Sequence, residues 1–384
     1  MKLRINFSVV ILAALVLTGC GVTSESIFPI GQTWTLKSKN VRVALNQKAQ
    51  SATVSVNGPG SYYSQESGAY LGRFKTLNRA VFSAKGNYVA INGNVGNSQN
   101  AVTRIMIVPD NAGLINLDGV AYRGQLEFVA KNGQLVIINH LGLEEYLCGV
   151  IPKETFPSWP RAALRAQAIA SRSYALSKCD SAASADFDLA APGDQLYGGQ
   201  SAETSSTTAA VYDTSGVYLE FNGQTLLTFF HTCCGGATED GVSIFPYVKT
   251  YPKGVVSPYC KDCKHYRWEY RITPSELGSK LGIGNVNAIN ITKRFKSGRA
   301  AEIVFLGSKG QVKKSGEELR KLVGYNLIKS TRLNVALVGN EWLFDGYGWG
   351  HGVGMCQWCS QKMAELGMSE EKILEHFYPG AVVK

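Results

Sequence analysis

The sequence predicts an α+β protein in which a β-rich N-terminal part at residues 39–138 precedes a mixed helix–strand region at 139–384. Three observations support this prediction. The 384 residues contain 41 Gly but only 12 Pro, which favours strands and turns. Short alternating apolar and polar runs fill the first part. From Leu143 onward the pattern changes to helical segments interleaved with strands.

The strands of the first part are indicated by alternation and by the turns between them. Residues 41–45 and 53–56 alternate, as a half-buried strand requires. Four dipeptides typical of tight hairpins follow such runs: Asn57-Gly58, Asn92-Gly93, Asp118-Gly119 and Asn132-Gly133. No repeat of solenoid length is visible, so the first part is predicted to be a sheet-based unit.

The second part begins with a short helical turn at 143–147 and an irregular loop at 152–160. Pro160 suits the first position of a helix that runs to about Lys178 and is rich in Ala, which permits close packing. Arg161, Arg165 and Arg172 share one face of it, either as a solvated stripe or as a rail for a polymer.

Strands and short helices alternate in the rest of the chain. Strand patterns occupy 207–230 and 303–306, and Thr273–Glu276 and Ser315–Glu318 match the capping box that opens a helix. The last helices are predicted at 357–366 and 370–377, with Gly367 just after the first and Ser369 as the N-cap of the second.

The charge balance points to an anionic partner. The 39 basic and 29 acidic residues give a formal charge of +10, which suits nucleic acid, a membrane surface or an acidic polymer. Because no basic low-complexity arm is present, nucleic acid is not indicated. The one long apolar run lies at the N-terminus, which excludes a multi-pass membrane protein.

Residues 1–20 have the features of a bacterial lipoprotein signal peptide. Lys2 and Arg4 precede an apolar stretch of about 13 residues, shorter than the ~20 needed to span a bilayer. It closes with Leu-Thr-Gly-Cys at 17–20, which resembles a lipobox and predicts lipidation of Cys20. An uncleaved signal anchor is the alternative. We therefore expect an extracytoplasmic, lipid-anchored protein of the cell envelope, with residues 21–38 as a linker from the membrane.

Eight cysteines remain after Cys20, an even number in an oxidising compartment, so disulfides are expected for some of them. The alternative is a structural zinc ion held by Cys234, Cys260 and Cys263, with His231 or His265 nearby. Zinc ranks second because no further C-x-x-C follows at the spacing usual for zinc sites.

The segment 346–354 has Gly at every second position, with Tyr347, Trp349, His351 and Val353 between. Strict alternation predicts an extended ribbon whose Gly face admits another backbone or a ligand. Trp349 offers a stacking face for a sugar. No Lys-Ser/Thr follows, so it is not a phosphate loop, and a structural tight turn is the alternative.

Glu154 is a second candidate for chemistry. It lies at 150–159 among apolar side chains and prolines. Such surroundings disfavour the anion and raise the pKa of the carboxyl, as a general acid requires. A single Glu in a loop is more often simply exposed.

Together these segments resemble the SpoIID/LytB family of bacterial cell-wall proteins over nearly the whole chain after residue 20. The matching stretches are LEEYLCGV (143–150), Glu154 with Trp159-Pro160, AQAIASRSYA (166–175), QLY (195–197), HTCCGG (231–236), GYGWGHGVGMCQ (346–357) and ILEHFYPG (373–380). The resemblance implies a catalytic core with a long substrate cleft.

The resemblance also implies a peptidoglycan lytic transglycosylase, which cleaves the β-1,4 bond between N-acetylmuramic acid and N-acetylglucosamine in strands that an amidase has stripped of peptides. The catalytic acid would be Glu154, and no cofactor is required. The side chains expected to contact the strand are Arg172, Tyr174, Gln195, Tyr197, His231, Trp349, His351 and Gln357.

Two features depart from the family pattern. A zinc site of the form Cys-x4-His-Cys in some members is replaced here by Asp188, Gly193 and Asp194, and Cys359 stands where a small residue is common. Two other functions stay open: a non-catalytic peptidoglycan-binding protein that stimulates an amidase, and a metal-dependent hydrolase that uses His231 and the cysteines.

Overall fold

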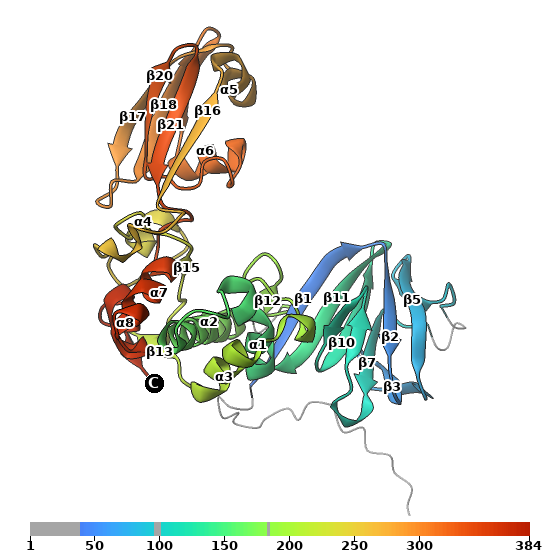
Figure 1. The fold of residues 1–384 in the computed structure, drawn as a ribbon. Helices are drawn as coiled ribbons and strands as arrows, with labels where there is room; N and C mark the ends of the chain where they lie inside the picture. The colour runs from blue at the N-terminus through green and yellow to red at the C-terminus, as the bar shows by residue number, and fades with distance from the viewer. Residues whose placement is uncertain (1–38, 96–100, 183–184) are drawn as a thin grey trace, which may run out of the picture.

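The computed structural model describes residues 39–95, 101–182 and 185–384. The predicted signal peptide, Cys20 and the linker lie outside the described residues. Three parts follow one another in space: a β-sandwich, a central part built on helices, and a lobe inserted between residues 267 and 347 (Figure 1). The mixture of helices and sheets confirms the predicted α+β class.

The β-sandwich contains two sheets. A seven-stranded sheet has the order β12-β1-β11-β10-β7-β3-β4, and a five-stranded sheet has the order β6-β5-β2-β8-β9. The first comprises β1 (Asn40–Ala49), β3 (Gly60–Ser64), β4 (Tyr70–Phe74), β7 (Arg104–Pro109), β10 (Gln125–Lys131), β11 (Gln134–Gly142) and β12 (Leu189–Ala190). The second comprises β2 (Ser51–Val56), β5 (Leu77–Lys85), β6 (Tyr88–Ile91), β8 (Ile115–Leu117) and β9 (Val120–Tyr122).

Alternation places one face of each sheet in a shared core. In β2, for example, Ala52, Val54 and Val56 are buried while their neighbours are not. Phe82 of β5 stacks on Phe128 of β10 with ring centroids 4.3 Å apart, which joins the two sheets. The region predicted to be rich in strands is therefore built as expected, and it ends where β11 leads directly into the first helix.

The central part is organised around one long helix. Its helices are α1 (Leu143–Glu154), α2 (Arg161–Ser181), α3 (Ser205–Asp213), α4 (Gly241–Ile244), α7 (Gln357–Glu365) and α8 (Glu370–Phe377). Ala166, Ala168 and Ala170 of α2 are fully buried, and these small side chains let α1, α3, α7 and α8 pack closely around it. Ser369 caps α8 as predicted, and Gly367 follows the end of α7 at φ +84°.

Three details of the helices differ from the prediction. Residues 205–213 form helix α3, although a strand pattern was predicted from 207 onward, because its buried residues Thr207, Ala210 and Val211 recur at helical spacing. The first helix does not stop at residue 147 but continues through Pro152 to Glu154. Pro152 lies in the last turn and removes one intrahelical hydrogen bond, a loss that the burial of Val150 and Ile151 offsets. The three arginines of α2 form neither a solvated stripe nor a rail, since each pairs with a different carboxylate: Arg161 with Asp213, Arg165 with Glu370 and Arg172 with Glu144.

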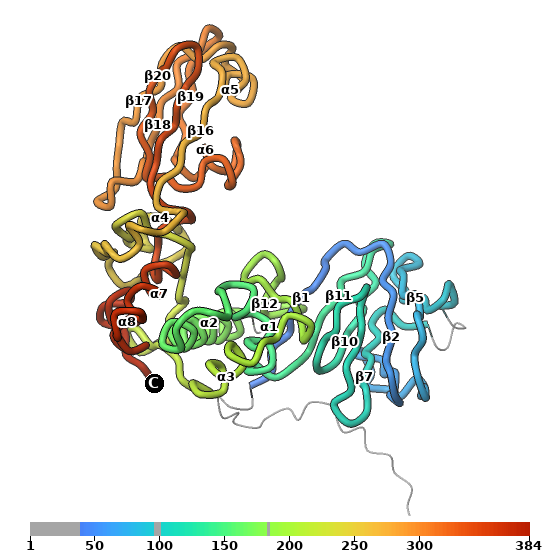
Figure 2. The backbone as a smooth tube through the Cα atoms, in the orientation of Figure 1, coloured from blue at the N-terminus to red at the C-terminus, as the bar shows by residue number. Residues whose placement is uncertain are grey.

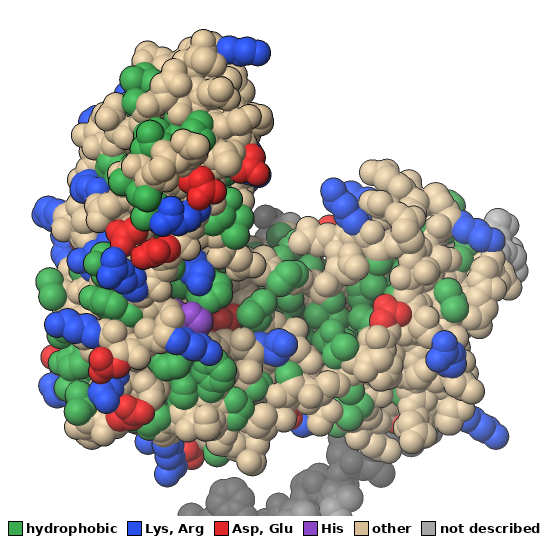
Figure 3. Space-filling model, turned by 45° about the horizontal axis from the view of Figure 1, so that its top comes forward, with side chains coloured by type: hydrophobic (Ala, Val, Ile, Leu, Met, Phe, Trp, Pro, Cys, Tyr) green, Lys and Arg blue, Asp and Glu red, His purple; other side chains and the backbone are tan. Residues whose placement is uncertain are grey.

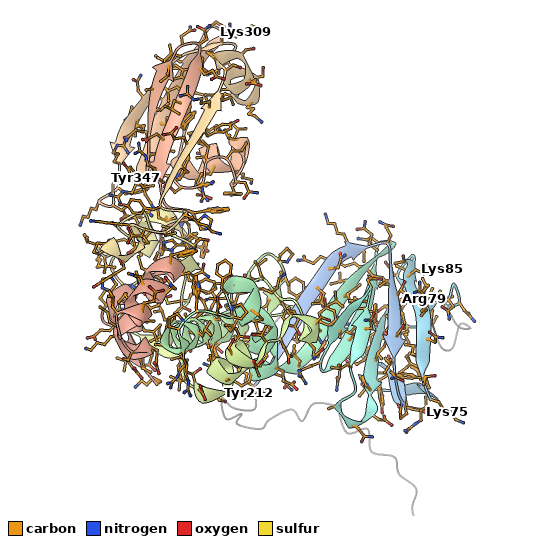
Figure 4. All side chains as sticks on the ribbon, in the orientation of Figure 1. Lys75, Arg79, Lys85, Tyr212, Lys309 and Tyr347 are labelled. Carbon is orange, nitrogen blue, oxygen red and sulfur yellow. The ribbon has the colours of Figure 1, made fainter. Side chains whose placement is uncertain are left out.

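The lobe is a unit with its own core. Its sheets are β16-β21-β20 and β17-β18-β19, and both predicted capping boxes open its helices. The elements are β16 (Arg267–Ile272), α5 (Pro274–Leu281), β17 (Val286–Arg294), β18 (Ala300–Gly307), β19 (Gly310–Lys314), α6 (Gly316–Val323), β20 (Leu333–Val338) and β21 (Glu341–Tyr347). Figure 2 follows the chain out to the lobe and back, and Tyr347 marks the return at its base (Figure 4).

The remaining elements are short, and most of them lie in the central part. They are η2 (Asp110–Ala112) at the edge of the sandwich, then η3 (Gln200–Ala202), β13 (Leu219–Phe221), β14 (Gln224–Thr225), β15 (Phe230–His231), η4 (Pro258–Cys260), β22 (Met355–Cys356) and β23 (Val382–Val383). The parallel pair β15–β22 joins segments that are far apart in the sequence. None of the helices in the described ranges has the length and apolar character needed to cross a bilayer.

A buried ion pair ties α2 to α1. Arg172 is fully buried and donates to both oxygens of Glu144, at 2.9 and 2.6 Å, and also to the carbonyls of Val211 and Val217. Loss of one partner leaves an uncompensated buried charge, which costs far more than loss of an exposed pair.

We expect Arg172→Met to lower the free energy of unfolding by about 3–5 kcal/mol. The matched control is Arg161→Met, whose pair with Asp213 is exposed and is expected to contribute at most ~1 kcal/mol. Urea unfolding followed by tryptophan fluorescence measures both. Addition of Glu144→Gln to Arg172→Met is expected to restore part of the loss, and equal effects of the two single variants would contradict this account.

Candidate active site

Three segments meet at Glu154, the last residue of α1. The carboxylate oxygen Oε1 accepts a hydrogen bond of 2.7 Å from the backbone N–H of Leu196. The backbone carbonyl of Glu154 accepts one of 2.9 Å from Nε2 of Gln357, at the start of α7. The side chain is half-buried. The contact with Gln357 brings the two predicted residues together.

The environment of Glu154 favours the protonated form of its carboxyl. Burial raises its pKa above the ordinary value, and the donors from Leu196 and Gln357 offset only part of that effect. Among the described residues, no Lys or Arg forms an ion pair with Glu154 to reverse it. A raised pKa suits a carboxyl that acts as a general acid.

The segment 195–197 positions the backbone N–H that binds Glu154. Gln195 is buried, and its Oε1 accepts a hydrogen bond of 3.1 Å from the hydroxyl of Tyr146. Tyr197 donates to Oδ1 of Asn139 at 2.9 Å. Both side chains point into the protein and fix the backbone between them, which presents the Leu196 N–H to the carboxylate. The predicted strand contact is therefore wrong for Gln195, which is 2% exposed and positions the site instead.

The two predicted residues on α2 are also engaged within the protein. The hydroxyl of Tyr174 donates to Oδ1 of Asp194 at 2.9 Å, and burial raises its pKa above the usual range. Arg172 is 0% exposed and is held by Glu144, so the prediction that it contacts a strand is wrong.

The two predicted histidines, His231 and His351, are neutral rings, the first buried and the second half-buried. Nε2 of His351 donates to the carbonyl of Phe230 at 2.9 Å, and Nδ1 accepts from the N–H of Val353 at 3.1 Å. Burial lowers the pKa of His351 to about 4, so it is uncharged at neutral pH. His231 is 4% exposed and bonds the Val353 carbonyl, and burial likewise lowers its pKa. The predicted strand contact is therefore wrong for His231, and His351 joins two backbone segments.

The glycine-rich segment is not the extended ribbon that its alternation predicts. Gly348, Gly350, Gly352 and Gly354 all have positive φ, between +67° and +115°. A Cβ atom at Gly352 would lie 2.1 Å from the guanidinium of Arg299, and one at Gly354 would lie 2.1 Å from the carbonyl oxygen of Phe229. The glycines are required because the protein's own groups approach closely, and the chain coils to make these contacts.

A row of rings leads away from Glu154 and was missed in the sequence apart from Trp349. We call it the aromatic row. Its members follow one another at centroid distances of 5.6 Å (Phe156–Trp159), 5.5 Å (Trp159–Trp358), 5.9 Å (Trp358–His265) and 4.8 Å (His265–Trp349). The ammonium of Lys329 lies 5.1 Å from the centre of the Trp349 ring. Phe156 and Trp159 both follow Glu154 closely in the sequence, and this proximity is the signal that could have revealed them.

The surface is hollowed between the lobe and the β-sandwich, where a histidine and an acidic side chain adjoin (Figure 3). Lined mainly by hydrophobic and uncharged groups in this view, the hollow runs across the central part. The helix end that carries Glu154 belongs to this central part.

The cysteines differ from both predictions. The eight described cysteines form no disulfide. The sulfurs of Cys234, Cys260, Cys356 and Cys359 gather in one buried group, whereas Cys263 is outside it. The second C-x-x-C motif, 356–359, supplies two of these four sulfurs, and neither was among the predicted zinc ligands.

The Cys-x4-His-Cys zinc site that some family members carry is not formed by residues 188, 193 and 194 of this chain. Asp188 pairs with Arg42 at 2.7 Å, and Asp194 pairs with Lys178 at 2.9 Å. Both carboxylates thus have cationic partners, and Gly193 offers no ligand atom.

Comparison with known proteins identifies the family. The family model described as "Stage II sporulation protein" (SpoIID) matches residues 131–221, which include α1, α2 and the 195–197 segment. An uncharacterized protein of Brachyspira hyodysenteriae is 31% identical over 271 residues, which cover 69% of this chain and 72% of that protein. Stage II sporulation protein D of Bacillus subtilis is 28% identical over 265 residues, which cover 64% and 75%. The chain belongs to the SpoIID/LytB family.

Other matches extend beyond this SpoIID region. The amidase enhancer of Bacillus subtilis is 27% identical over 369 residues, which cover 82% of this chain and half of the relative. A domain of unknown function, DUF8618, matches residues 259–354, which comprise the lobe and its two connections to the central part. This SpoIID/LytB chain therefore combines a SpoIID region, residues 131–221, with a separately recognised insertion at 259–354.

The hydrogen bonds at Glu154 predict how its pKa responds to substitution. We expect an NMR titration to place the pKa of Glu154 above the ~4.3 of an exposed Glu. In Gln357→Leu it is expected to rise further, because a donor that lowers the pKa is removed. Gln361→Leu is the control, because Gln361 lies one turn further along α7 and donates to Glu365, and it should leave the pKa of Glu154 unchanged. A lower pKa in Gln357→Leu would contradict this assignment.

Proposed function

We propose that this protein is a peptidoglycan lytic transglycosylase that acts on glycan strands stripped of their peptides. The observation that carries the proposal is Glu154. Its carboxyl has a raised pKa, it is fixed by the Leu196 N–H, and it stands at the surface of the family's matched region.

One carboxyl is sufficient for this reaction. Protonated Glu154 gives its proton to the glycosidic oxygen as the bond to C1 of N-acetylmuramic acid breaks. The resulting carboxylate then takes the proton of the C6 hydroxyl, whose oxygen forms the new bond to C1. The products are a 1,6-anhydro end and a free N-acetylglucosamine end, and no water is consumed. Ordinary glycosidases need a second carboxylate for the water or the covalent intermediate.

The local carboxylates agree with such a single-residue mechanism. Asp194 and Glu154 both raise the pKa values of Tyr146 and Tyr174. Asp194 is therefore the neighbouring carboxylate to consider as a second catalytic group. It already binds Lys178 at 2.9 Å, the hydroxyl of Tyr174 and the N–H of Ala190. These contacts occupy both of its oxygens, which leaves the proton transfers to Glu154.

The aromatic row supplies a surface for sugar rings. Phe156 is 49% exposed and lies two residues after Glu154. Flat rings offer apolar faces to the C–H faces of sugars at little entropic cost. A row that begins at the acid and continues to Trp349 suits an extended polymer more than a small molecule.

The proposed cellular setting follows from the substrate. Peptide-free strands are produced by an amidase, so a peptidoglycan amidase is the expected functional partner, and a relative of this chain is named amidase enhancer. We also propose lipidation of Cys20 and anchoring in the cell envelope, where the strands are found.

The decisive experiment compares wild type with Glu154→Gln on amidase-treated glycan strands, with products read by mass spectrometry. Wild type is expected to release 1,6-anhydro-muramic products, and Glu154→Gln to lose at least ~10²-fold in rate, the usual contribution of a positioned acid. Glu375→Gln, an exposed Glu paired only with Lys372 on α8, is the matched control and should behave as wild type.

Other results of this assay lead to different conclusions. Equal product from wild type and Glu154→Gln would reject Glu154 as the acid. If wild type binds the strands and stimulates an amidase but forms no anhydro product, the chain is a non-catalytic enhancer instead.

The aromatic row predicts a loss of strand binding on truncation. Phe156→Ala is expected to weaken binding of denuded strands about tenfold, measured by co-sedimentation or fluorescence titration with the Glu154→Gln protein to prevent turnover. Tyr325→Ala removes an equally exposed ring from the lobe and serves as the control. Unchanged binding by Phe156→Ala would place the strand elsewhere.

A further inference from the structure

Four cysteine sulfurs converge in the centre of the molecule. Cys234 follows β15, Cys260 ends η4, Cys356 lies in β22, and Cys359 lies in the first turn of α7. Their sulfur atoms all lie within 4.8 Å of one another, and all four residues are at most 1% exposed. The sulfur of Cys234 is 3.5 Å from that of Cys260 and 3.6 Å from that of Cys359.

These separations fit one tetrahedral metal ion. A disulfide requires sulfurs ~2.05 Å apart. Four thiolates at ~2.3 Å from a zinc ion form a tetrahedron with edges of ~3.8 Å. In a four-iron cluster each sulfur binds a different iron, which spreads the sulfurs farther apart. We propose that Cys234, Cys260, Cys356 and Cys359 bind a single structural Zn²⁺ ion.

The surroundings are built for negatively charged sulfur. Backbone N–H groups donate to two of the four sulfurs: Cys234 and Cys359 to the sulfur of Cys356, at 3.1 and 3.4 Å, and Gly236 to that of Cys234, at 3.3 Å. The sulfur of Cys356 also caps the N-terminus of α7, where the helix dipole favours an anion. Such N–H···S contacts orient and stabilise metal-bound thiolates.

A buried cation gives a second, independent indication. Arg299 reaches in from the lobe, is 0% exposed, and donates to the backbone carbonyls of Cys234 and Ala237 at 2.9 and 2.8 Å. Its Nε has no hydrogen-bond partner, and no carboxylate forms an ion pair with it among the described residues. A buried guanidinium needs a negative partner. The buried carboxylate of Glu239 is close enough to favour the charged guanidinium, and a zinc ion with four thiolates, with a net charge of −2, would be a second negative partner.

The ion would hold the active-site wall in place. Between Cys356 and Cys359 lie only Gln357, which binds the backbone of Glu154, and Trp358, a member of the aromatic row. All four coordination positions are filled by protein, so the ion stabilises the structure and does not bind substrate. This role for Gln357 and Trp358 rests on the proposed function, whereas the presence of the metal does not.

The two nearest other cysteines provide the control. Cys233 precedes a ligand, and Cys263 is half-buried, with its sulfur accepting from the N–H of His265 at 3.2 Å. Neither belongs to the four-sulfur group. Cys263→Ser is therefore expected to keep the ion, whereas Cys359→Ser is expected to lose it.

The test is metal analysis of the purified full-length protein, with X-ray absorption at the zinc edge. We expect one zinc per chain, with four sulfur neighbours at ~2.3 Å. Zinc retained after dialysis against a chelator should fall at least tenfold in Cys359→Ser but not in Cys263→Ser. The wild-type measurements stand even if Cys359→Ser does not fold.

Several results would overturn the proposal. They are a metal-free wild type with disulfides among these four cysteines, iron in place of zinc, zinc with mixed nitrogen and sulfur neighbours, or equal loss of zinc in both variants. Zinc content is expected to be unchanged in Glu154→Gln. A failure of the transglycosylase proposal would therefore leave the metal result intact, and a metal-free but lytic protein would do the reverse.

Discussion

The close approach of the glycine-rich segment to residues 229–236 is the contact on which the centre of this protein depends. Trp349 and Cys233 exchange backbone hydrogen bonds of 2.8 and 3.0 Å, and β22 pairs with β15 immediately afterwards. These contacts set where α7 begins. Because α7 begins there, Gln357 reaches Glu154, and Cys356 and Cys359 reach Cys234. A side chain at Gly348 or Gly354 would separate the two backbones and displace both groups together.

This arrangement separates chemistry from support. Most of the polar side chains that the motifs supply form hydrogen bonds within the protein: Gln195 with Tyr146, Tyr197 with Asn139, and His351 with two backbone groups. What remains accessible is one carboxyl with a raised pKa and a set of aromatic rings. Such a site has few polar groups to lose to solvent, and its specificity rests on shape and stacking along a strand.

Much of the fold could be read from local patterns, and the failures have a common cause. The β-rich half, the capping boxes and the α8 cap depend on neighbours in the sequence, and they were predicted correctly. The extension of α1 to Glu154 depends on burial of Val150 and Ile151, which outweighs the local signal of Pro152. The glycine alternation looked like a strand because its partners, such as Arg299, are distant in the sequence and invisible to a periodicity.

The same limit applies to the site. Motif positions indicated that Gln357 and the 195–197 segment contact Glu154, but they did not tell whether a side chain faces solvent or the core. Arg172 and His231 belong to the motifs because they hold the site together from within. Only Cys234 and Cys260 of the sulfur group were among the predicted zinc ligands, because its members come from three distant segments and only the fold brings the motif at 356–359 to them.

The lobe shows why a long insertion is compatible with this geometry. Its first strand, β16, pairs with its last, β21, so that Arg267 lies opposite Tyr347 and the chain leaves and re-enters the central part at one point. Just outside this closure, the ring centroids of His265 and Trp349 lie 4.8 Å apart. Cys263 precedes His265 in the sequence, and Cys356 follows Trp349. The lobe thus acts as a closed loop that keeps its two ends together. It also sends Arg299 back to the sulfur group, so the lobe and the active-site wall are folded around the same buried charges.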